Sequence, residues 1–364
     1  MEGMRWTAAI WAKGLMSAAA LACVLFFATA AQAAVTQPPQ PKSGPGGSDY
    51  PHAGMRVSSG GSGSDAWYVF QPKGPRPERA PLAIVMHGYY EFAGYDSMEA
   101  FIEHTVRQGS VVIYPRWQTG IAEPCPGPYY IEPCLDSAVN GIHGAMGYLS
   151  SKPNAVRPER RRTSYFGFSF GGIITANLAN RYRDLGLPKP RAIFLDDPHD
   201  GGLNGPGEPA LDDTLGGIPK SVKLECHSGA EGVISEPGKE GSSCNAVFSL
   251  LGGIPDRNKD LVMTRTDDHG EPALSSAHGV CAGGDPAATP FGAPNAYDWN
   301  FCWKVWDALR SCAYSGTDCG YALSDTRRHR SMGRWSDGRR VKPLTIQDDP
   351  PLRPPSMNRS GTTP

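Results

Sequence analysis

The sequence has no surplus of charge of either sign. Its 35 Lys and Arg residues nearly balance its 36 Asp and Glu residues, which gives a formal net charge of -1 at pH 7. A chain without a basic surplus lacks the electrostatic footprint of a polyanion-binding protein, so we expect no nucleic-acid partner. The sequence also lacks internal repeats and any His-x-x-x-His or similar ligand spacing. We therefore predict no repeat architecture, no metal and no cofactor.

The composition excludes a chain that is disordered or membrane-embedded throughout. The 364 residues are 40% hydrophobic and 20% charged, which is enough apolar material for a full core. Two stretches hold too few large apolar residues to fold, namely 34–64, rich in Gly, Pro and Ser, and the polar, Pro-rich 341–364. We predict a flexible, disordered linker and a disordered tail there, which leaves 65–340 as a single structured domain.

The first 33 residues have the pattern of a secretory signal peptide. Arg5 and Lys13 precede an apolar and small-residue run over 14–30, and a small-x-small site follows at 31–33. We predict cleavage after Ala33, a secreted or periplasmic location, and no membrane span in the mature chain. The alternative is an uncleaved anchor, because the run is close to the shortest length that spans a membrane.

Cysteine usage agrees with secretion. Nine cysteines are present, and cleavage of the signal peptide removes Cys23 and leaves an even number. Short separations favour two of the many possible pairings, and the other four cysteines would then complete the set. The expected disulfides are Cys125 with Cys134, Cys312 with Cys319, Cys226 with Cys244, and Cys281 with Cys302.

Apolar runs rich in β-branched residues alternate with segments of helical period inside the structured region. Continuous apolar runs such as 81–86 and 110–114 are typical of strands buried on both faces. Amphipathic segments at 96–109 and 136–151 follow them as helices. The rhythm predicts an α/β fold with a mostly parallel central sheet and helices on both faces.

The segment Gly167-Phe168-Ser169-Phe170-Gly171 carries the clearest chemical signal. It is a Gly-x-Ser-x-Gly motif between a short strand and a helix, which is the context of a nucleophile elbow. Glycines are needed beside such a serine because side chains there would collide with neighbouring elements. The turn would present the serine hydroxyl at a helix N-terminus, where free N–H groups favour developing negative charge.

With these motifs the sequence resembles the α/β-hydrolase superfamily, over about residues 65 to 325. PLAIVMHGYY resembles its strand and oxyanion loop, SVVIYP its next strand, and YFGFSFGG its elbow. Together with the secretion signal and the cysteines, the pattern is similar to extracellular esterases and lipases, including the cutinase and polyester-hydrolase group and dienelactone-hydrolase relatives. The resemblance implies the α/β-hydrolase fold, acyl transfer, and a serine, acid and histidine in that order along the chain.

Ser169 is the expected nucleophile, and its oxyanion hole needs two fixed N–H donors. The backbone N–H of Phe170, which follows the nucleophile, would be one donor, and that of Tyr89 would be the other. Tyr90 and Trp117 lie just past strand ends on the same side of the predicted sheet. We expect these two aromatic residues to contact the substrate.

Two carboxylates compete for the role of the acid. The strand predicted at 221–226 is followed by Ser228-x-x-Glu231-x-x-Ile234, which has the spacing of the acid segment of the superfamily. Serine replaces glycine in it and glutamate replaces aspartate. We favour Glu231, with Asp197, after the preceding strand, as the alternative.

Two histidines follow the last predicted strand, at 259–264. His269 is closer to the end of that strand. His278 follows a short apolar stretch that could turn the chain back over the edge of the sheet. We favour His278 as the base, with His269 as the alternative.

The prediction that results is a secreted serine-dependent carboxylic-ester hydrolase, an esterase or lipase that acts through an acyl-enzyme on Ser169. Its substrate would be a small-molecule or polymeric ester, and we expect a monomer. A serine peptidase of the same fold is one alternative, since nothing in the sequence separates amide from ester cleavage. A non-catalytic binding protein with the hydrolase fold is another, and the intact order of serine, acid and histidine argues against it.

Overall fold

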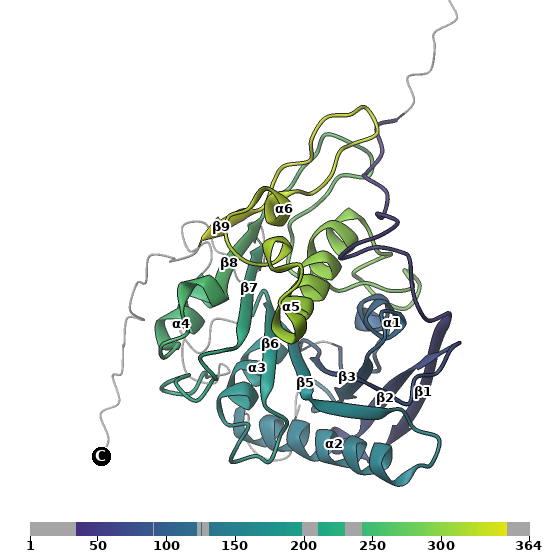
Figure 1. Ribbon diagram of the computed structural model, residues 1–364, viewed down its shortest axis with the longest axis vertical. Coiled ribbons are helices and arrows are strands. Elements are labelled where there is room, and N and C mark those ends of the chain that lie inside the picture. The colour runs from purple at the N-terminus through teal and green to yellow at the C-terminus, as the bar shows by residue number, and fades with distance from the viewer. Residues whose placement is uncertain are drawn as a thin grey trace, which may run out of the picture. The chain divides into compact units, whose positions relative to one another are not determined.

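The computed structural model describes residues 34–89, 91–121, 125, 131–198, 210–229 and 242–347. The predicted signal peptide and the end of the predicted tail lie outside these residues. Nine strands form one sheet (Figure 1). In chain order they are β1 (Gly54–Gly60), β2 (Trp67–Lys73), β3 (Arg79–Met86), β4 (Val111–Pro115), β5 (Arg157–Phe168), β6 (Pro190–Asp196), β7 (Lys223–Gly229), β8 (Lys259–Thr264) and β9 (Thr345–Gln347).

The sheet has a parallel centre and antiparallel edges. Its strand order is β1-β2-β4-β3-β5-β6-β7-β8-β9. Strands from β4 to β8 pair in parallel, whereas β1, β2 and β9 run antiparallel to their neighbours. The parallel strands are buried along most of their length, which explains their continuous apolar runs. The predicted α/β class with a mostly parallel sheet is confirmed.

Helices cover both faces of the sheet (Figure 1). They are α1 (Glu99–Arg107), α2 (Ile131–Ser151), α3 (Phe170–Asn180), α4 (Ser242–Leu250), α5 (Trp303–Ser315) and α6 (Arg327–Arg330). Apolar residues of α2, α3 and α4 belong to one buried cluster, and those of α1 and α5 belong to a second. The two clusters are the two faces of the sheet, so the chain builds three layers.

The structure differs from the linker expected at 34–64. The described residues from Val35 onward belong to one compact unit, and β1 pairs with β2 along its whole length. Before β1, the chain is held by hydrogen bonds between its backbone and side chains of the later chain, and Val35 packs against the core. The indole Nε1 of Trp299 donates to the Pro38 carbonyl at 3.0 Å, and the Gly46 N–H donates to Asp307 at 3.0 Å.

The start of the expected disordered tail is also ordered. Val341 and Leu344 are buried, and β9 pairs with β8. Residues 348–364 lie outside the described part of the chain. The polar composition at this end was misleading because a short edge strand gains its stability from backbone pairing.

All four expected disulfides are present. Their Cα atoms lie 4.7 to 5.7 Å apart, within the usual range for the bond. The pairs join Cys125 to Cys134, Cys226 to Cys244, Cys281 to Cys302 and Cys312 to Cys319. They are consistent with an extracellular or otherwise oxidising location.

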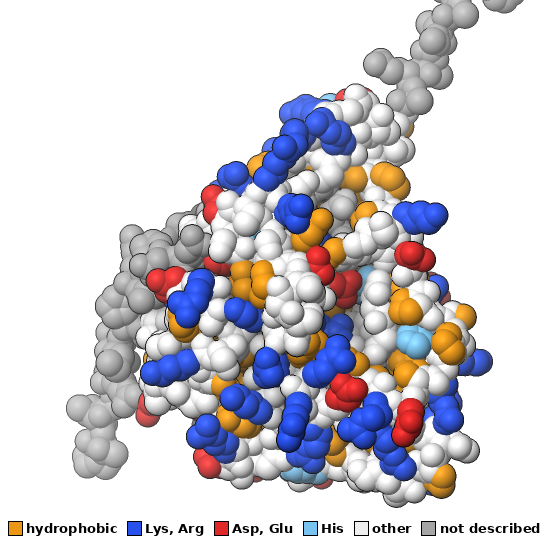
Figure 2. Space-filling model, viewed as in Figure 1, with side chains coloured by type: hydrophobic (Ala, Val, Ile, Leu, Met, Phe, Trp, Pro, Cys, Tyr) orange, Lys and Arg blue, Asp and Glu red, His pale blue; other side chains and the backbone are white. Residues whose placement is uncertain are grey.

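On the face shown in Figure 2, charges of both signs are present, and basic side chains gather over α6 and the loops that follow it. The exposed arginines of that region are Arg327, Arg328, Arg330, Arg334, Arg339 and Arg340. The small net charge therefore conceals a local basic patch. Within the described ranges, none of the helices combines the length and the apolar character that crossing a membrane requires.

Candidate active site

Ser169 occupies a strained turn between β5 and α3. Its backbone has φ 53° and ψ -123°, a conformation that residues with a side chain rarely adopt. The Ser169 N–H donates to the Asp196 carbonyl at 3.0 Å, which ties the turn to the end of β6. The side chain is almost buried, with 8% of the residue exposed, and it immediately precedes the first turn of α3.

The glycines around Ser169 are required by crowding. A Cβ on Gly171 would collide with the backbone of His87, and one on Gly167 would collide with Thr175. A Cβ on Gly172 would lie 2.7 Å from the Cβ of Pro198. The crowding predicted beside the serine of this motif is therefore present.

His278 pairs with Asp197. Its Nδ1 lies 2.6 Å from Oδ2 of Asp197, and the aspartate side chain is almost completely buried. Burial lowers the pKa of His278, but the hydrogen bond and the negative charge of Asp197 outweigh that effect. The pKa is therefore raised above its usual 6.5. The carboxylate fixes the tautomer in which Nδ1 carries the proton and Nε2 can accept one.

His278 and the serine turn lie at the same end of the parallel strands. The ring of Phe168, which immediately precedes Ser169, lies 4.8 Å from the ring of His278 between centroids. Asp196, which binds the N–H of Ser169, immediately precedes Asp197. Nucleophile candidate, base candidate and carboxylate thus gather where β5 and β6 end.

A second set of polar contacts holds the loop that carries His278. His227 on β7 contacts Asp196 at 2.7 Å through Nδ1 and the Thr264 hydroxyl at 2.9 Å through Nε2. The Thr264 hydroxyl also lies 2.6 Å from that of Ser276, two residues before His278. Asp196, His227, Thr264 and Ser276 are all buried. The network connects three strand ends to the loop that presents the base.

The two residues expected to form the oxyanion hole lie side by side. The rings of Tyr89 and Phe170 stack with their centroids 5.6 Å apart, and the Tyr89 hydroxyl donates to the Ile121 carbonyl. Trp117 stacks on Phe170 at 5.0 Å and is completely buried. The structure therefore places Trp117 in the packing behind the site, where it has no exposed surface to offer a substrate.

Three predicted residues remain, namely Glu231, Tyr90 and His269. Glu231 and Tyr90 lie outside the described residues. His269 contacts Asp337 at 2.7 Å through Nε2 and Arg339 at 2.8 Å through Nδ1. The alternative acid, Asp197, is the carboxylate that the structure joins to a predicted base.

Sequence reasoning missed Glu91, four residues after His87. Its Oε2 atom is buried and has no hydrogen-bond partner among the described residues. A Cβ on Gly88 would collide with that oxygen. Burial raises the pKa of the Glu91 carboxyl to about 7, although the charge of His278 acts in the opposite direction. No motif includes this residue, and only its position in the predicted oxyanion loop could have drawn attention to it.

A separate buried cluster contains the only set of side chains in the described ranges that could hold a metal ion. It consists of Glu225, Asp260 and His329, whose ligand atoms all lie within 4.8 Å of one another. Nε2 of His329 lies 2.8 Å from Glu225, and Nδ1 donates to the Ser324 carbonyl at 3.0 Å. These contacts attach α6 to β7.

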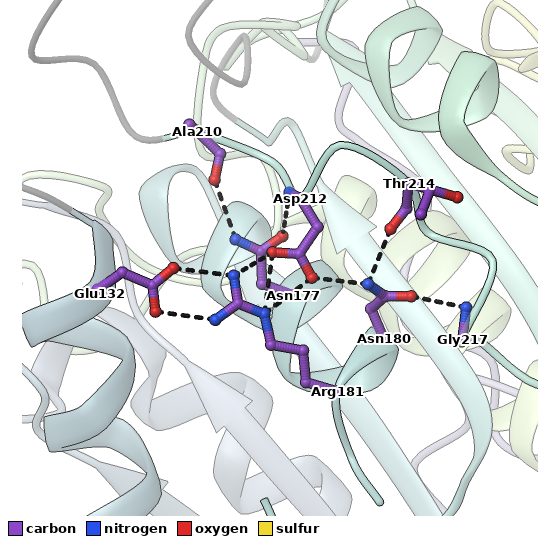
Figure 3. A network of polar contacts seen from close by, with 8 residues as sticks. All are labelled: Glu132, Asn177, Asn180, Arg181, Ala210, Asp212, Thr214 and Gly217. Atoms are coloured by element: carbon purple, nitrogen blue, oxygen red, sulfur yellow. Dashed lines mark hydrogen bonds and ion pairs between the residues drawn. The ribbon is translucent and has the colours of Figure 1, made fainter. Parts of the chain in front are cut away.

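The far end of α3 is fixed by a surface network (Figure 3). Arg181 binds Glu132 of α2 through two hydrogen bonds of 2.8 Å and also binds Asp212. Asn180 donates to the Thr214 carbonyl at 2.8 Å. The helix that begins at the serine turn is thereby held against α2 and the segment 210–217.

A comparison with known protein families found no family that the sequence matches, and a comparison with curated proteins found no match.

Proposed function

We propose that this protein is a secreted serine hydrolase with the α/β-hydrolase fold, which cleaves carboxylic esters through an acyl-enzyme on Ser169. The contact between Asp197 and His278, beside the strained serine turn, is the observation that carries the proposal. A histidine whose Nδ1 is held by a buried carboxylate is organised to accept a proton at Nε2. The order Ser169, Asp197, His278 along the chain also supports it.

In the proposed reaction, His278 accepts the hydroxyl proton of Ser169 as the serine oxygen attacks the ester carbonyl. The backbone N–H groups of Tyr89 and Phe170 stabilise the negative oxygen of the tetrahedral intermediate. The intermediate collapses, and the alcohol leaves with the proton held by His278. Water then attacks the acyl-enzyme with the same histidine as base, which releases the acid and restores Ser169. Asp197 stabilises the imidazolium throughout.

The test is hydrolysis of p-nitrophenyl esters of increasing chain length by the mature protein, beside Ser169→Ala, His278→Ala and His269→Ala. We expect the first two substitutions to lower kcat by at least about 10,000-fold. His269→Ala should retain activity because its ring is engaged by Asp337 and Arg339. Unchanged turnover by Ser169→Ala would refute the mechanism. A parallel p-nitroanilide series separates ester from amide cleavage.

A further inference from the structure

Glu91 is a partly buried acid near the base of the proposed hydrolase, and the mechanism does not use it. Its Oε2 atom is buried, and among the described residues no group donates a hydrogen bond to it. A buried carboxyl oxygen without a donor is costly, so a protein that keeps one gains something else from it. In an enzyme, that missing donor can belong to the substrate.

The position of Glu91 is fixed by close contacts in the oxyanion loop. Its carboxyl packs on the α-carbon of Gly88, since a Cβ there would collide with Oε2. The same Cβ would lie 3.0 Å from the ring of Phe168, and that ring packs on His278. The charges of Glu91 and His278 interact, and each shifts the protonation of the other.

The mechanism of ester cleavage indicates which part of the substrate would contact Glu91. In ester cleavage the histidine delivers its proton to the oxygen of the departing alcohol. The alcohol half of the ester therefore lies beside His278, and Glu91 is close enough to His278 for their charges to interact. A carboxyl oxygen that receives no hydrogen bond from a described residue is complemented by a hydroxyl or a protonated amine on that alcohol.

We propose that Glu91 is a specificity-determining residue that binds a hydrogen-bond donor, a hydroxyl or a protonated amine, on the leaving alcohol of the ester substrate. The inference rests on the proposed function. It assigns the substrate class as esters of alcohols that carry such a donor a short distance from the ester oxygen. Esters of simple alkyl alcohols leave the buried oxygen without a partner and are the poorer substrates.

The test uses two matched pairs of butyrate esters. In one pair 2-hydroxyethyl butyrate is compared with n-propyl butyrate, and in the other 2-(dimethylamino)ethyl butyrate is compared with 3-methylbutyl butyrate. The ratio of kcat/KM within each pair is measured for the wild type, Glu91→Met and Glu91→Gln. Intrinsic differences in leaving ability cancel when the ratios of two variants are compared.

We expect Glu91→Met to lower at least one ratio by about tenfold or more, because the donor then loses its acceptor. Glu91→Gln keeps a carbonyl acceptor but no charge. It preserves the ratio if the bound donor is a hydroxyl, and loses it if the donor is an ammonium group. The glutamine variant also keeps the size and shape of the side chain, so it remains informative if the methionine variant does not fold.

Glu103→Met is the matched control, since Glu103 is an exposed residue of α1 paired with Arg107. Its ratios should equal those of the wild type. Equal ratios in the wild type and both Glu91 variants would overturn the inference, as would an equal change in the Glu103 variant. Ser169→Ala, assayed on the same esters, tests the proposed function separately from the role of Glu91. Retained activity there overturns the proposed function, whereas lost activity with unchanged Glu91 ratios overturns only the role of Glu91.

Discussion

Asp197 and His278 lie 81 residues apart in the chain, and Oδ2 of the first is 2.6 Å from Nδ1 of the second. Asp197 follows directly after β6 with a positive φ of 43°. The loop after β8 brings His278 to it, and the polar contacts of His227 and Thr264 hold that loop. This contact supports the assignment of Asp197, rather than Glu231, as the orienting acid.

Replacing Asp197 with asparagine should therefore lower kcat by about 10,000-fold, because the amide favours the wrong tautomer of His278. The measurement is ester hydrolysis under saturating substrate, with circular dichroism as a check on folding. Glu231→Gln is the companion variant and should change kcat much less. A larger loss in the Glu231 variant would contradict the assignment of the acid.

The raised pKa of His278 predicts an acid limb in the pH profile of kcat/KM. The histidine must be neutral to accept the serine proton, so activity should rise with pH through a midpoint above 6.5. Asp197 provides the hydrogen bond and charge that raise the pKa, so the residual activity of Asp197→Asn should show a lower midpoint. A wild-type midpoint below 6.5, or one that the substitution does not move, would count against this pairing.

The centre of the fold was predictable because its signals are local. Continuous apolar runs such as 81–86 became the buried parallel strand β3, and the motif around Ser169 became the turn before α3. Two of the four disulfides also followed from short separations along the chain. In each case the residues that decide the structure are close together in sequence.

Which carboxylate is the acid depends on the order of the strands in the sheet. Local sequence patterns do not reveal that order. Glu231 and Asp197 both follow strands, and the spacing after the later strand matched the superfamily better. In the sheet, however, β6 lies next to β5, so its end is the nearer one to Ser169. Glu91 was not predicted for a related reason. Its proposed role depends on the groups that surround it in the folded chain, and these are not apparent from the sequence.

The edge strands of the sheet were not predicted, because their segments hold few large apolar residues. The region 34–64 holds few large apolar residues, yet β1 within it pairs along its full length with β2. The three-residue β9 pairs with β8. Such strands are stabilised by backbone hydrogen bonds at an edge exposed to water, and hydrophobic pattern does not report on those bonds.

Crowding at the serine turn predicts a large loss of stability for Gly171→Ala. The added Cβ would meet the backbone of His87, which cannot move without displacing β3. We expect a loss of about 3 kcal/mol or more in the free energy of unfolding, measured with urea. Gly147→Ala is the matched control, since that glycine lies in α2 with nothing within 4 Å of an added Cβ. It should stabilise the protein by up to about 1 kcal/mol, and equal effects of the two substitutions would contradict the steric argument.

The disulfide between Cys281 and Cys302 should matter for activity as well as stability, because Cys281 is close to His278 in the chain. Replacing both cysteines with alanine should lower the free energy of unfolding by about 3 kcal/mol. It should also lower kcat/KM by about 10- to 100-fold as the histidine loses its fixed position.

The matched control for that disulfide is the pair Cys312–Cys319, which closes a short loop at the end of α5. Its double alanine variant should lose about 2 kcal/mol and keep its kcat/KM. Both are measured well below the melting temperature of the weaker variant. Equal losses of activity in the two variants would show that the first bond has no special relation to the histidine loop.

Lys304 should make stability depend on pH in the alkaline range. Its buried ammonium donates to the carbonyls of His329 at 2.8 Å and Ser331 at 2.7 Å. Burial lowers the pKa of Lys304 from 10.5 to about 7, although the charge of Glu225 acts against the shift. Above pH 7 the folded chain therefore loses a proton that the unfolded chain still binds. The contribution of Lys304 to the free energy of unfolding should accordingly rise with pH above this value.

The measurement is the free energy of urea unfolding from pH 6 to pH 9, compared between the wild type and Lys304→Met. The contribution of Lys304 should rise by up to about 1.4 kcal/mol per pH unit above pH 7 and should be absent in the variant. Below pH 7 the ammonium is charged in both states, so the two curves should run parallel. Lys342→Met removes the same charge from an exposed position and should keep the wild-type slope. A slope that survives in Lys304→Met would show that another group titrates on unfolding.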